Sequence, residues 1–123
     1  VWRAGFVTDD LVREIAPVTK VVSSLVLHQT PLEEKRLILD GAFALLEPGG
    51  EIHIADYGQQ HSAMMRFLFR QTVQRLDGIE DTQPNADGVL PELISKAGFI
   101  DIAESDVIHT LTGSISIYQA KRP

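Results

Sequence analysis

The sequence of 123 residues contains no cysteine, which excludes disulfide frameworks, thiolate zinc sites and thiol nucleophiles. Positive charge is also scarce, because 11 Lys and Arg residues stand against 17 Asp and Glu residues and leave a net charge of -6. A negatively charged protein repels phosphate backbones and anionic lipid surfaces. We therefore expect neither a nucleic-acid partner nor a membrane partner.

Long apolar runs are missing as well. The longest relevant stretch without charge, Gly or Pro, residues 21–30, is far shorter than the ~20 residues that a membrane-spanning helix needs. The first twenty residues offer no signal-peptide core because charged side chains interrupt them, namely Arg3, Asp9, Asp10, Arg13 and Glu14. Together with the absence of cysteine, these features predict a cytoplasmic protein. The first residue is Val1 rather than Met, which favours a truncated sequence.

The remaining composition is typical of a folded protein, with 44% apolar and 23% charged residues. The length favours a single domain over residues 1–123. The segment VVSSLVL, from Val21 to Leu27, is rich in β-branched residues and predicts a central strand covered on both faces. Thr30 and Pro31 then predict the start of a helix, which must end at the turn 47–50 before a second strand, 51–56. This strand–helix–strand order predicts a parallel, right-handed crossover.

The second half of the chain predicts a helix over residues 60–76, a loop over 77–88 and a short helix over 90–97. Two strands follow, over residues 99–106 and 114–121, joined as a hairpin. In the last strand Ile115 and Ile117 alternate with polar residues, which is typical of a half-solvated antiparallel edge. The predicted fold class is α/β, with parallel strands, an antiparallel C-terminal strand and helices on both faces.

Four segments carry a resemblance to a known family: VVSSLVLHQ, LLEPGGEIHIADYG, LPELISKAGF and GSISIYQAKRP, in this order. The chain resembles the C-terminal part of class I S-adenosylmethionine-dependent methyltransferases of the type 11-like group, and the opening VWRAGF looks like the family's third strand. The resemblance implies a partial Rossmann-like sheet and S-adenosylmethionine as the cofactor. The family's glycine-rich first strand–turn unit has no counterpart here, because the only Gly pair, Gly49 and Gly50, follows a helix. We therefore expect a methyltransferase portion with weak or no activity by itself.

The resemblance also implies candidate site residues. Those expected at the cofactor are Phe6, Ser24, Leu25 and His28, and those expected at the substrate are Asp56 and Tyr57. His28 either shapes the methionine end of the cofactor, accepts a substrate proton, or caps the strand through backbone hydrogen bonds. Asp56 either meets the substrate or accepts turn amides. No catalytic residue is assigned. No metal is expected, because strand alternation places His53 and Asp56 on opposite faces.

Several alternatives remain open. The hydrogen-bonding edge of the strand 21–27 lacks its family neighbour, so we predict that residues 1–7 cover it or that two chains pair there as a homodimer. The chain is then either an enzyme portion acting on a small molecule or a non-catalytic dimerisation or regulatory module. A phosphoacceptor receiver domain, with Asp9, Asp10 and Asp56 as its acids, is less favoured because Asp10 and Lys20 lie too close together for a full helix and its loops. Arg66 and Arg70, four residues apart, either hold an anionic ligand or form a solvated helix face.

Overall fold

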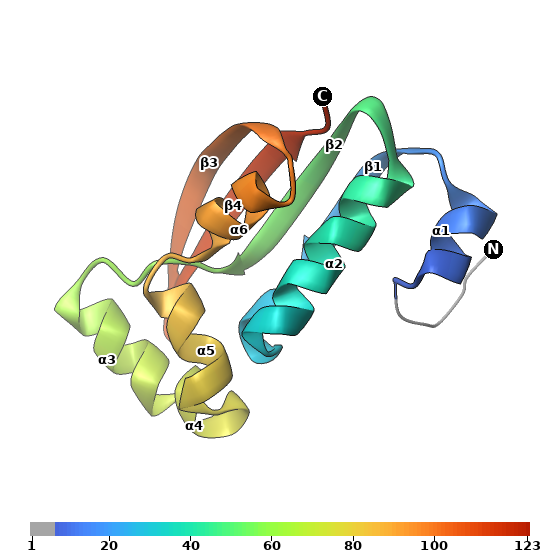
Figure 1. Cartoon of the computed structure of the whole chain (residues 1–123). Helices are drawn as coiled ribbons and strands as arrows, with labels where there is room; N and C mark the ends of the chain where they lie inside the picture. Colours follow the sequence, from blue (N-terminus) through green and yellow to red (C-terminus); the bar gives the residue numbers. More distant parts are fainter. Residues whose placement is uncertain (1–6) are drawn as a thin grey trace.

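The computed structural model describes residues 7–123, which form one mixed sheet with helices around it (Figure 1). The strands are β1 (Val18–Ser24), β2 (Leu46–Tyr57), β3 (Ile100–Thr110) and β4 (Gly113–Lys121). The helices are α1 (Asp9–Ile15), α2 (Leu32–Leu45), α3 (Ala63–Gln71), α4 (Val73–Asp77), α5 (Ile79–Ala86) and α6 (Leu90–Lys96), with a short 3-10 turn, η1 (Leu27–Gln29), after β1. Phe6 and the expected strand VWRAGF lie outside the described residues.

The sheet has the strand order β1-β2-β4-β3. β1 and β2 are parallel and joined through α2, whereas β4 is antiparallel to both of its neighbours. This topology confirms the predicted α/β fold with an antiparallel C-terminal strand. It rules out the receiver-domain alternative, because that fold has an all-parallel sheet.

Helices lie on both faces of the sheet, as predicted. On one face, α2 and α6 cover Ile52 and Ile54 of β2 together with Tyr118 of β4, and the helices contribute Leu39, Ala42, Leu90, Leu93 and Ile94 to this core. On the other face, α3 reaches only the carboxyl end of β2, where Phe69 packs in a second cluster with Tyr57 and Ile115. The second cluster therefore lies at the edge of the sheet where β1 and β2 end.

The prediction for the first strand, residues 21–27, is wrong at both ends, since β1 begins at Val18. β1 ends at Ser24 rather than Leu27, because Leu25 has a positive φ of 54° and the chain then turns into η1. Within residues 7–123, β1 pairs only with β2, and Val22 on its outer face is 73% exposed. The β-branched composition predicted the strand correctly, but the described part of the sheet leaves it at an edge and uncovered on one face.

The prediction for the last strand is wrong as well, because β4 lies inside the sheet between β2 and β3. Its register pairs Ser116 with Asp56 and Tyr118 with Ile54, so the serines and the tyrosine turn toward the helices and are buried. Ile115 and Ile117 lie on the opposite, partly exposed face. Cross-strand pairing with β2 thus decides which face of β4 is buried, against the hydrophobicity of its side chains.

Three local predictions for the helices also need correction. The expected helix 60–76 is broken at Thr72 into α3 and α4, and the expected loop 77–88 contains α5. α5 forms despite Pro84 because buried polar side chains tie it to its surroundings: Thr82 donates to the carbonyl of Gly78, and Asn85 donates to that of Tyr57. Thr30 does not cap α2, since its hydroxyl donates to the Leu27 carbonyl instead.

Of the segment expected to cover the β1 edge, only Val7 is described, and it is not part of a strand. Its side chain packs against α2 at Gly41, where any added Cβ would lie 2.5 Å from Val7 Cγ1. None of the helices within residues 7–123 combines the length and the apolar character required to span a bilayer.

Candidate functional site

The carboxyl ends of the two parallel strands bring together two residues that the sequence analysis selected. Asp56 is the penultimate residue of β2 and is fully buried, and His28 lies in η1 directly after β1. His28 Nδ1 lies 2.7 Å from Asp56 Oδ1, and the imidazole is 6% exposed. The structure therefore joins the expected cofactor residue His28 to the expected substrate residue Asp56.

The Asp56 carboxylate organises the turn that carries His28. Its Oδ2 accepts from the amides of Val26 (3.1 Å) and Leu27 (2.7 Å), and its Oδ1 accepts from the Tyr57 amide (2.8 Å). A carboxylate that already accepts amide hydrogens offers only acceptor oxygens to an imidazole, so His28 Nδ1 carries the proton. Asp56 thus accepts turn amides, which is one of its two expected roles, and it also orients His28. Its expected contact with a substrate stays a prediction.

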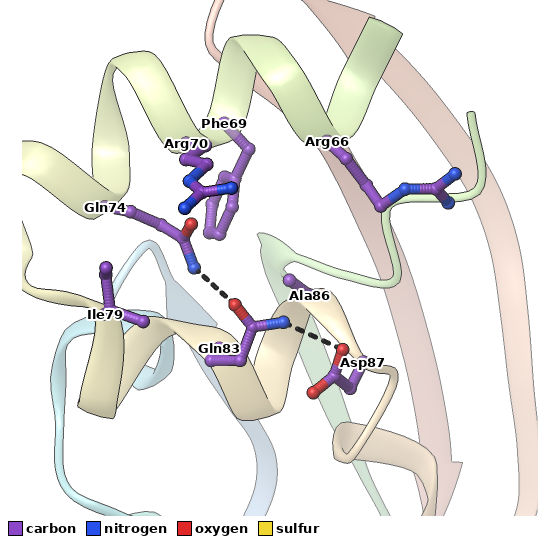
Figure 2. A pocket seen from close by; sticks show the side chains of 8 residues that line it. All are labelled: Arg66, Phe69, Arg70, Gln74, Ile79, Gln83, Ala86 and Asp87. Atoms are coloured by element: carbon purple, nitrogen blue, oxygen red, sulfur yellow. Dashed lines mark hydrogen bonds between the residues drawn. The ribbon is translucent and has the colours of Figure 1, made fainter. Parts of the chain in front are cut away.

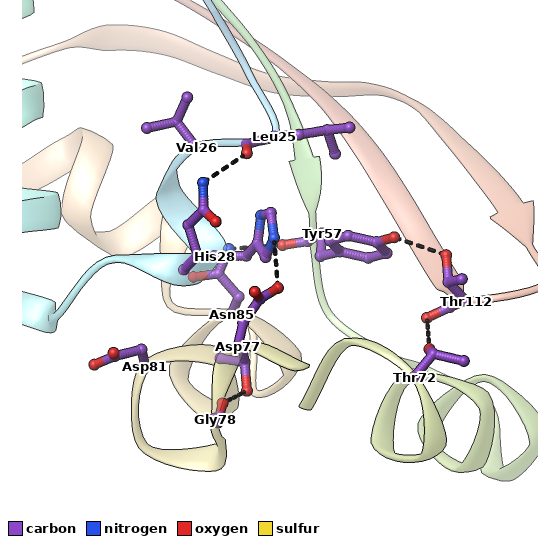
Figure 3. Close-up of polar contacts among 12 residues, drawn as sticks. Leu25, Val26, His28, Tyr57, Thr72, Asp77, Gly78, Asp81, Asn85 and Thr112 are labelled. Carbon is purple, nitrogen blue, oxygen red and sulfur yellow. Dashed lines mark hydrogen bonds and ion pairs between the residues drawn. The ribbon is translucent and has the colours of Figure 1, made fainter. Parts of the chain in front are cut away.

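The other side of the imidazole faces a second carboxylate. His28 Nε2 lies 3.4 Å from Asp77 Oδ2, at the end of α4, and Figure 3 shows the ring of His28 between Tyr57 and Asp77. The rings of His28 and Tyr57 meet edge-on, with centroids 4.9 Å apart. The two ring nitrogens of His28 therefore face one carboxylate each, Nδ1 that of Asp56 and Nε2 that of Asp77.

Tyr57 forms a wall of the site. Its hydroxyl lies 2.7 Å from Thr112 Oγ1, and its backbone carbonyl accepts from Asn85 (Figure 3). Its ring packs against Phe69, with centroids 5.2 Å apart. The ring is buried on both sides. This packing fixes the position of Tyr57 next to His28, and its expected contact with a substrate stays a prediction.

A buried lysine joins the elements around the site. Lys35 in α2 is fully buried, and its ammonium donates to the carbonyls of Thr30 and, at 2.8 Å, Asp81. Burial lowers the pKa of Lys35 below its usual 10.5, although the nearby carboxylates of Asp81 and Asp56 oppose this shift. Lys35 therefore ties α5 to the start of α2, directly beside η1.

The expected role of the remaining residues in binding the cofactor stays a prediction. Ser24 is the exposed last residue of β1, and Leu25, 43% exposed, donates its amide to the Ala55 carbonyl of β2 at 2.9 Å. Phe6 lies outside the described residues. Residues 7–123 contain no group of three or more His, Asp or Glu side chains arranged to hold a metal ion.

Sequence reasoning missed Asp77, Lys35 and Asn85. Asp77 and Asn85 fall within the segment expected to be a loop, and Lys35 falls on a charged helix turn where an exposed side chain is the ordinary expectation. No signal in the sequence distinguishes these residues from solvated ones, because only the packing of α4 and α5 onto η1 brings them to the site.

No family model matches the sequence, and no curated protein matches it. Solved structures do match. Human N-acetylserotonin methyltransferase in complex with S-adenosylmethionine has a TM-score of 0.64 at 16% identity, covering 98% of this chain and 33% of its own. An O-methyltransferase family protein from Burkholderia thailandensis gives 0.60 at 15% identity, covering 90% of this chain and 32% of its own. The N-methyltransferase NodS from Bradyrhizobium japonicum, in complex with S-adenosylhomocysteine, gives 0.53 at 13% identity, covering 88% and 48%.

The chain has the class I methyltransferase fold. The resemblance drawn from the four sequence segments is thereby confirmed at the level of the fold. The chain spans about a third of the length of the first matched methyltransferases, at 30%, 32% and 33%. Several of the methyltransferases with this fold are bound to S-adenosylmethionine or S-adenosylhomocysteine, which supports S-adenosylmethionine as the cofactor of the family.

Proposed function

We propose that this chain is a portion of an S-adenosylmethionine-dependent methyltransferase. It supplies one wall of the cofactor site and the base that takes a proton from the substrate receiving the methyl group. The observation that carries the proposal is the pair His28–Asp56, held at 2.7 Å at the carboxyl ends of adjacent parallel strands in a methyltransferase fold. Ligands of open α/β sheets bind at this edge. A small-molecule acceptor and a cytoplasmic location belong to the same proposal.

The chemistry that S-adenosylmethionine supplies, when bound, is an electrophilic methyl group. The residues of this chain would act on the acceptor, whose O–H or N–H proton must leave as the new bond to the methyl forms. Because His28 Nδ1 donates to Asp56, Nε2 is the nitrogen left to accept that proton. The carboxylates of Asp56 and Asp77 then stabilise the imidazolium from both sides.

The exposed carboxyl end of β1 fits one side of a nucleoside cofactor. Ser24, the last residue paired with β2, is exposed there with its hydroxyl, and Leu25 follows it with an exposed side chain. Neither strand-to-helix connection within residues 7–123 carries a glycine-rich turn to hold the rest of the cofactor. We infer that these residues alone bind the cofactor weakly, and that activity by themselves is weak or absent.

Titration of the 15N-labelled 123-residue chain with S-adenosylhomocysteine tests this proposal. We expect amide shifts confined to Ser24, Leu25 and His28 and their neighbours, saturating at about millimolar concentration, that is about 4 kcal/mol of binding. Titration with adenine alone is the control, since the homocysteine end should add shifts at His28. Micromolar binding would contradict the inferred weakness, and no shift at any of these residues would favour a non-catalytic module.

The second candidate function is assembly through the edge of β1 that no strand within residues 7–123 covers. Among the described residues β1 has one partner strand, and an apolar groove of about 290 Å³ lies beside it, lined among others by Val7, Val21 and Val26. An unpaired, apolar strand edge favours pairing with another strand, and we propose a second copy of this chain as the partner. Pairing of two chains at this edge of β1 would make the chain a dimerisation or regulatory module.

Sedimentation equilibrium tests the second candidate. We expect the mass of a dimer for the unmodified chain and of a monomer for Val22→Lys, which places a charge on the exposed face of the edge strand. Leu111→Lys is the matched control, because Leu111 is also largely exposed, at 86% against 73% for Val22, but lies in the β3–β4 turn. A monomeric unmodified chain at about 100 μM would exclude a dimer with a dissociation constant in the micromolar range.

A further inference from the structure

A cavity of about 280 Å³ lies between α3, α4 and α5 (Figure 2). None of the residues that line it is a hydrogen-bond or ion-pair partner of the His28 side chain. Its lining includes Phe69 and Arg70 of α3, Gln74 of α4, and Ile79, Gln83 and Ala86 of α5. The volume is near the lower end of the ~300–1,000 Å³ typical of ligand pockets. It therefore suits a ligand of about one ring or a short chain.

The α3 side of this cavity is positively charged. Residues 57–76 contain no Asp or Glu and three arginines, Arg66, Arg70 and Arg75, although the net charge of the chain is -6. Two of the three, Arg66 and Arg70, line the cavity, whereas Asp87 of the opposite side also lines it. The α3 side thus offers guanidinium groups to an anion.

The two arginines differ in what they already bind. Arg66 donates to the carbonyls of Gln60 (3.1 Å) and His61 (3.2 Å), and Figure 2 shows it extended away from the other side chains. Arg70 makes no hydrogen bond or ion pair with any residue of the described chain, and Figure 2 shows its guanidinium turned toward Gln74, beside Phe69. A planar guanidinium with free donors matches a carboxylate in two parallel hydrogen bonds.

The other walls set the kind of anion. Phe69 is buried and, with Ala86, gives the cavity an apolar floor. Gln74, only 7% exposed, donates to Gln83 at 2.9 Å, and Gln83 donates to Asp87 at 2.9 Å. This chain of hydrogen bonds holds a negative charge at the rim opposite Arg70, which disfavours a ligand with several negative charges.

We propose that the α3–α5 cavity binds a small organic monocarboxylate with an apolar body. Its carboxylate pairs with Arg70, and its apolar part lies on Phe69 and Ala86. The site does not depend on methyl transfer. It is nevertheless connected to the candidate active site, because the ring of Phe69 packs on Tyr57 and that of Tyr57 packs on His28.

Binding of benzoate, followed by calorimetry and by amide shifts of the full 123-residue chain, tests this proposal. We expect shifts at Phe69, Gln74 and Ala86, and a dissociation constant at least about tenfold weaker in Arg70→Gln, as loss of a charge-assisted hydrogen bond predicts. Arg75→Gln removes the same charge outside the cavity, where Arg75 contacts only Gln71 at 3.5 Å, and should bind benzoate as the unmodified chain does.

Benzamide, which has the same ring without the charge, should bind at least about tenfold more weakly than benzoate. Equal binding of benzamide, equal losses in both arginine variants, or no benzoate binding at about 20 mM would each overturn the proposal. Because no cofactor is present in these titrations, their failure leaves the result of the S-adenosylhomocysteine titration unaffected.

Discussion

Replacement of Asp56 by alanine should destabilise the protein more than any other single carboxylate deletion among the described residues, because so many donors converge on it. The buried carboxylate accepts from the amides of Val26, Leu27 and Tyr57 and from His28 Nδ1. Each buried donor that loses its partner costs about 1–3 kcal/mol. The Leu27 and Tyr57 amides are buried, so Asp56→Ala should lower the free energy of unfolding by about 3–5 kcal/mol, as for other broken buried pairs.

Urea denaturation followed by circular dichroism measures this loss. Asp56→Asn keeps one acceptor oxygen, so it should lose about 1–3 kcal/mol, less than alanine. Asp40→Ala is the control, since Asp40 is exposed on α2 and its loss should stay within about 0.5 kcal/mol. If Asp56→Ala costs no more than Asp40→Ala, the carboxylate does not organise the turn, and the geometry given for His28 is wrong.

Three further predictions concern the packing of the sheet. Burial raises the pKa of Tyr118 from 10.0 to about 12, so the folded state holds this proton more tightly than the unfolded state does. The free energy of unfolding should therefore fall as the pH rises from 10 toward 12. In urea titrations across this pH range, Tyr118→Phe should show a smaller fall. Gly58→Ala places a Cβ 2.1 Å from Ser116 Oγ and should lower the free energy of unfolding by about 2–3 kcal/mol. In Gly78→Ala the Cβ meets no atom within 4 Å, so only the positive φ of this residue costs stability, about 1–2 kcal/mol. A larger loss in Gly78→Ala than in Gly58→Ala would contradict the close packing of Gly58 on Ser116. Arg122→Gln removes the guanidinium that donates to the carbonyls of Phe43 in α2 and of Leu46 directly after it. This change should lower the urea midpoint, with a loss of about 1–2 kcal/mol; an unchanged midpoint would contradict this role.

The order of strands and helices could be predicted from the sequence where the hydrophobic pattern and the stop signals agree. Three local signals are borne out by the structure: the uncharged segment VVSS at 21–24 with its two β-branched valines, the Pro-Gly-Gly stop after α2, and Gly98 after α6, with its φ of +102°. Their agreement is also why the resemblance to methyltransferases, carried by the same segments, was sufficient to predict the fold.

The elements that the sequence did not predict depend on contacts between distant residues. α5 has the composition of a loop, and its helical conformation depends on Asn85 donating to the Tyr57 carbonyl, which only the folded chain presents. The buried face of β4 follows from its register with β2 rather than from its two isoleucines. Such tertiary contacts override local propensity.

The candidate site likewise combines residues whose position could be predicted from the sequence with residues whose position could not. Strand ends place His28 and Asp56 at one edge of the sheet, and this could be predicted from sequence. That Asp56 also holds the turn carrying His28, and that Asp77 closes the other side of the imidazole, depends on how η1 and α4 pack. Lys35 is missed for the same reason, because its burial arises from the docking of α5.

The protonation of one ring nitrogen decides whether this site can accept a proton from a methyl acceptor. Nitrogen-15 NMR of the imidazole, recorded where the His28 ring is neutral, reports it directly. The structure predicts a protonated Nδ1 bonded to Asp56 and an unprotonated Nε2, with this preference lost in Asp56→Ala if that variant folds. A neutral ring protonated at Nε2 in the unmodified protein would contradict the proposed role of His28.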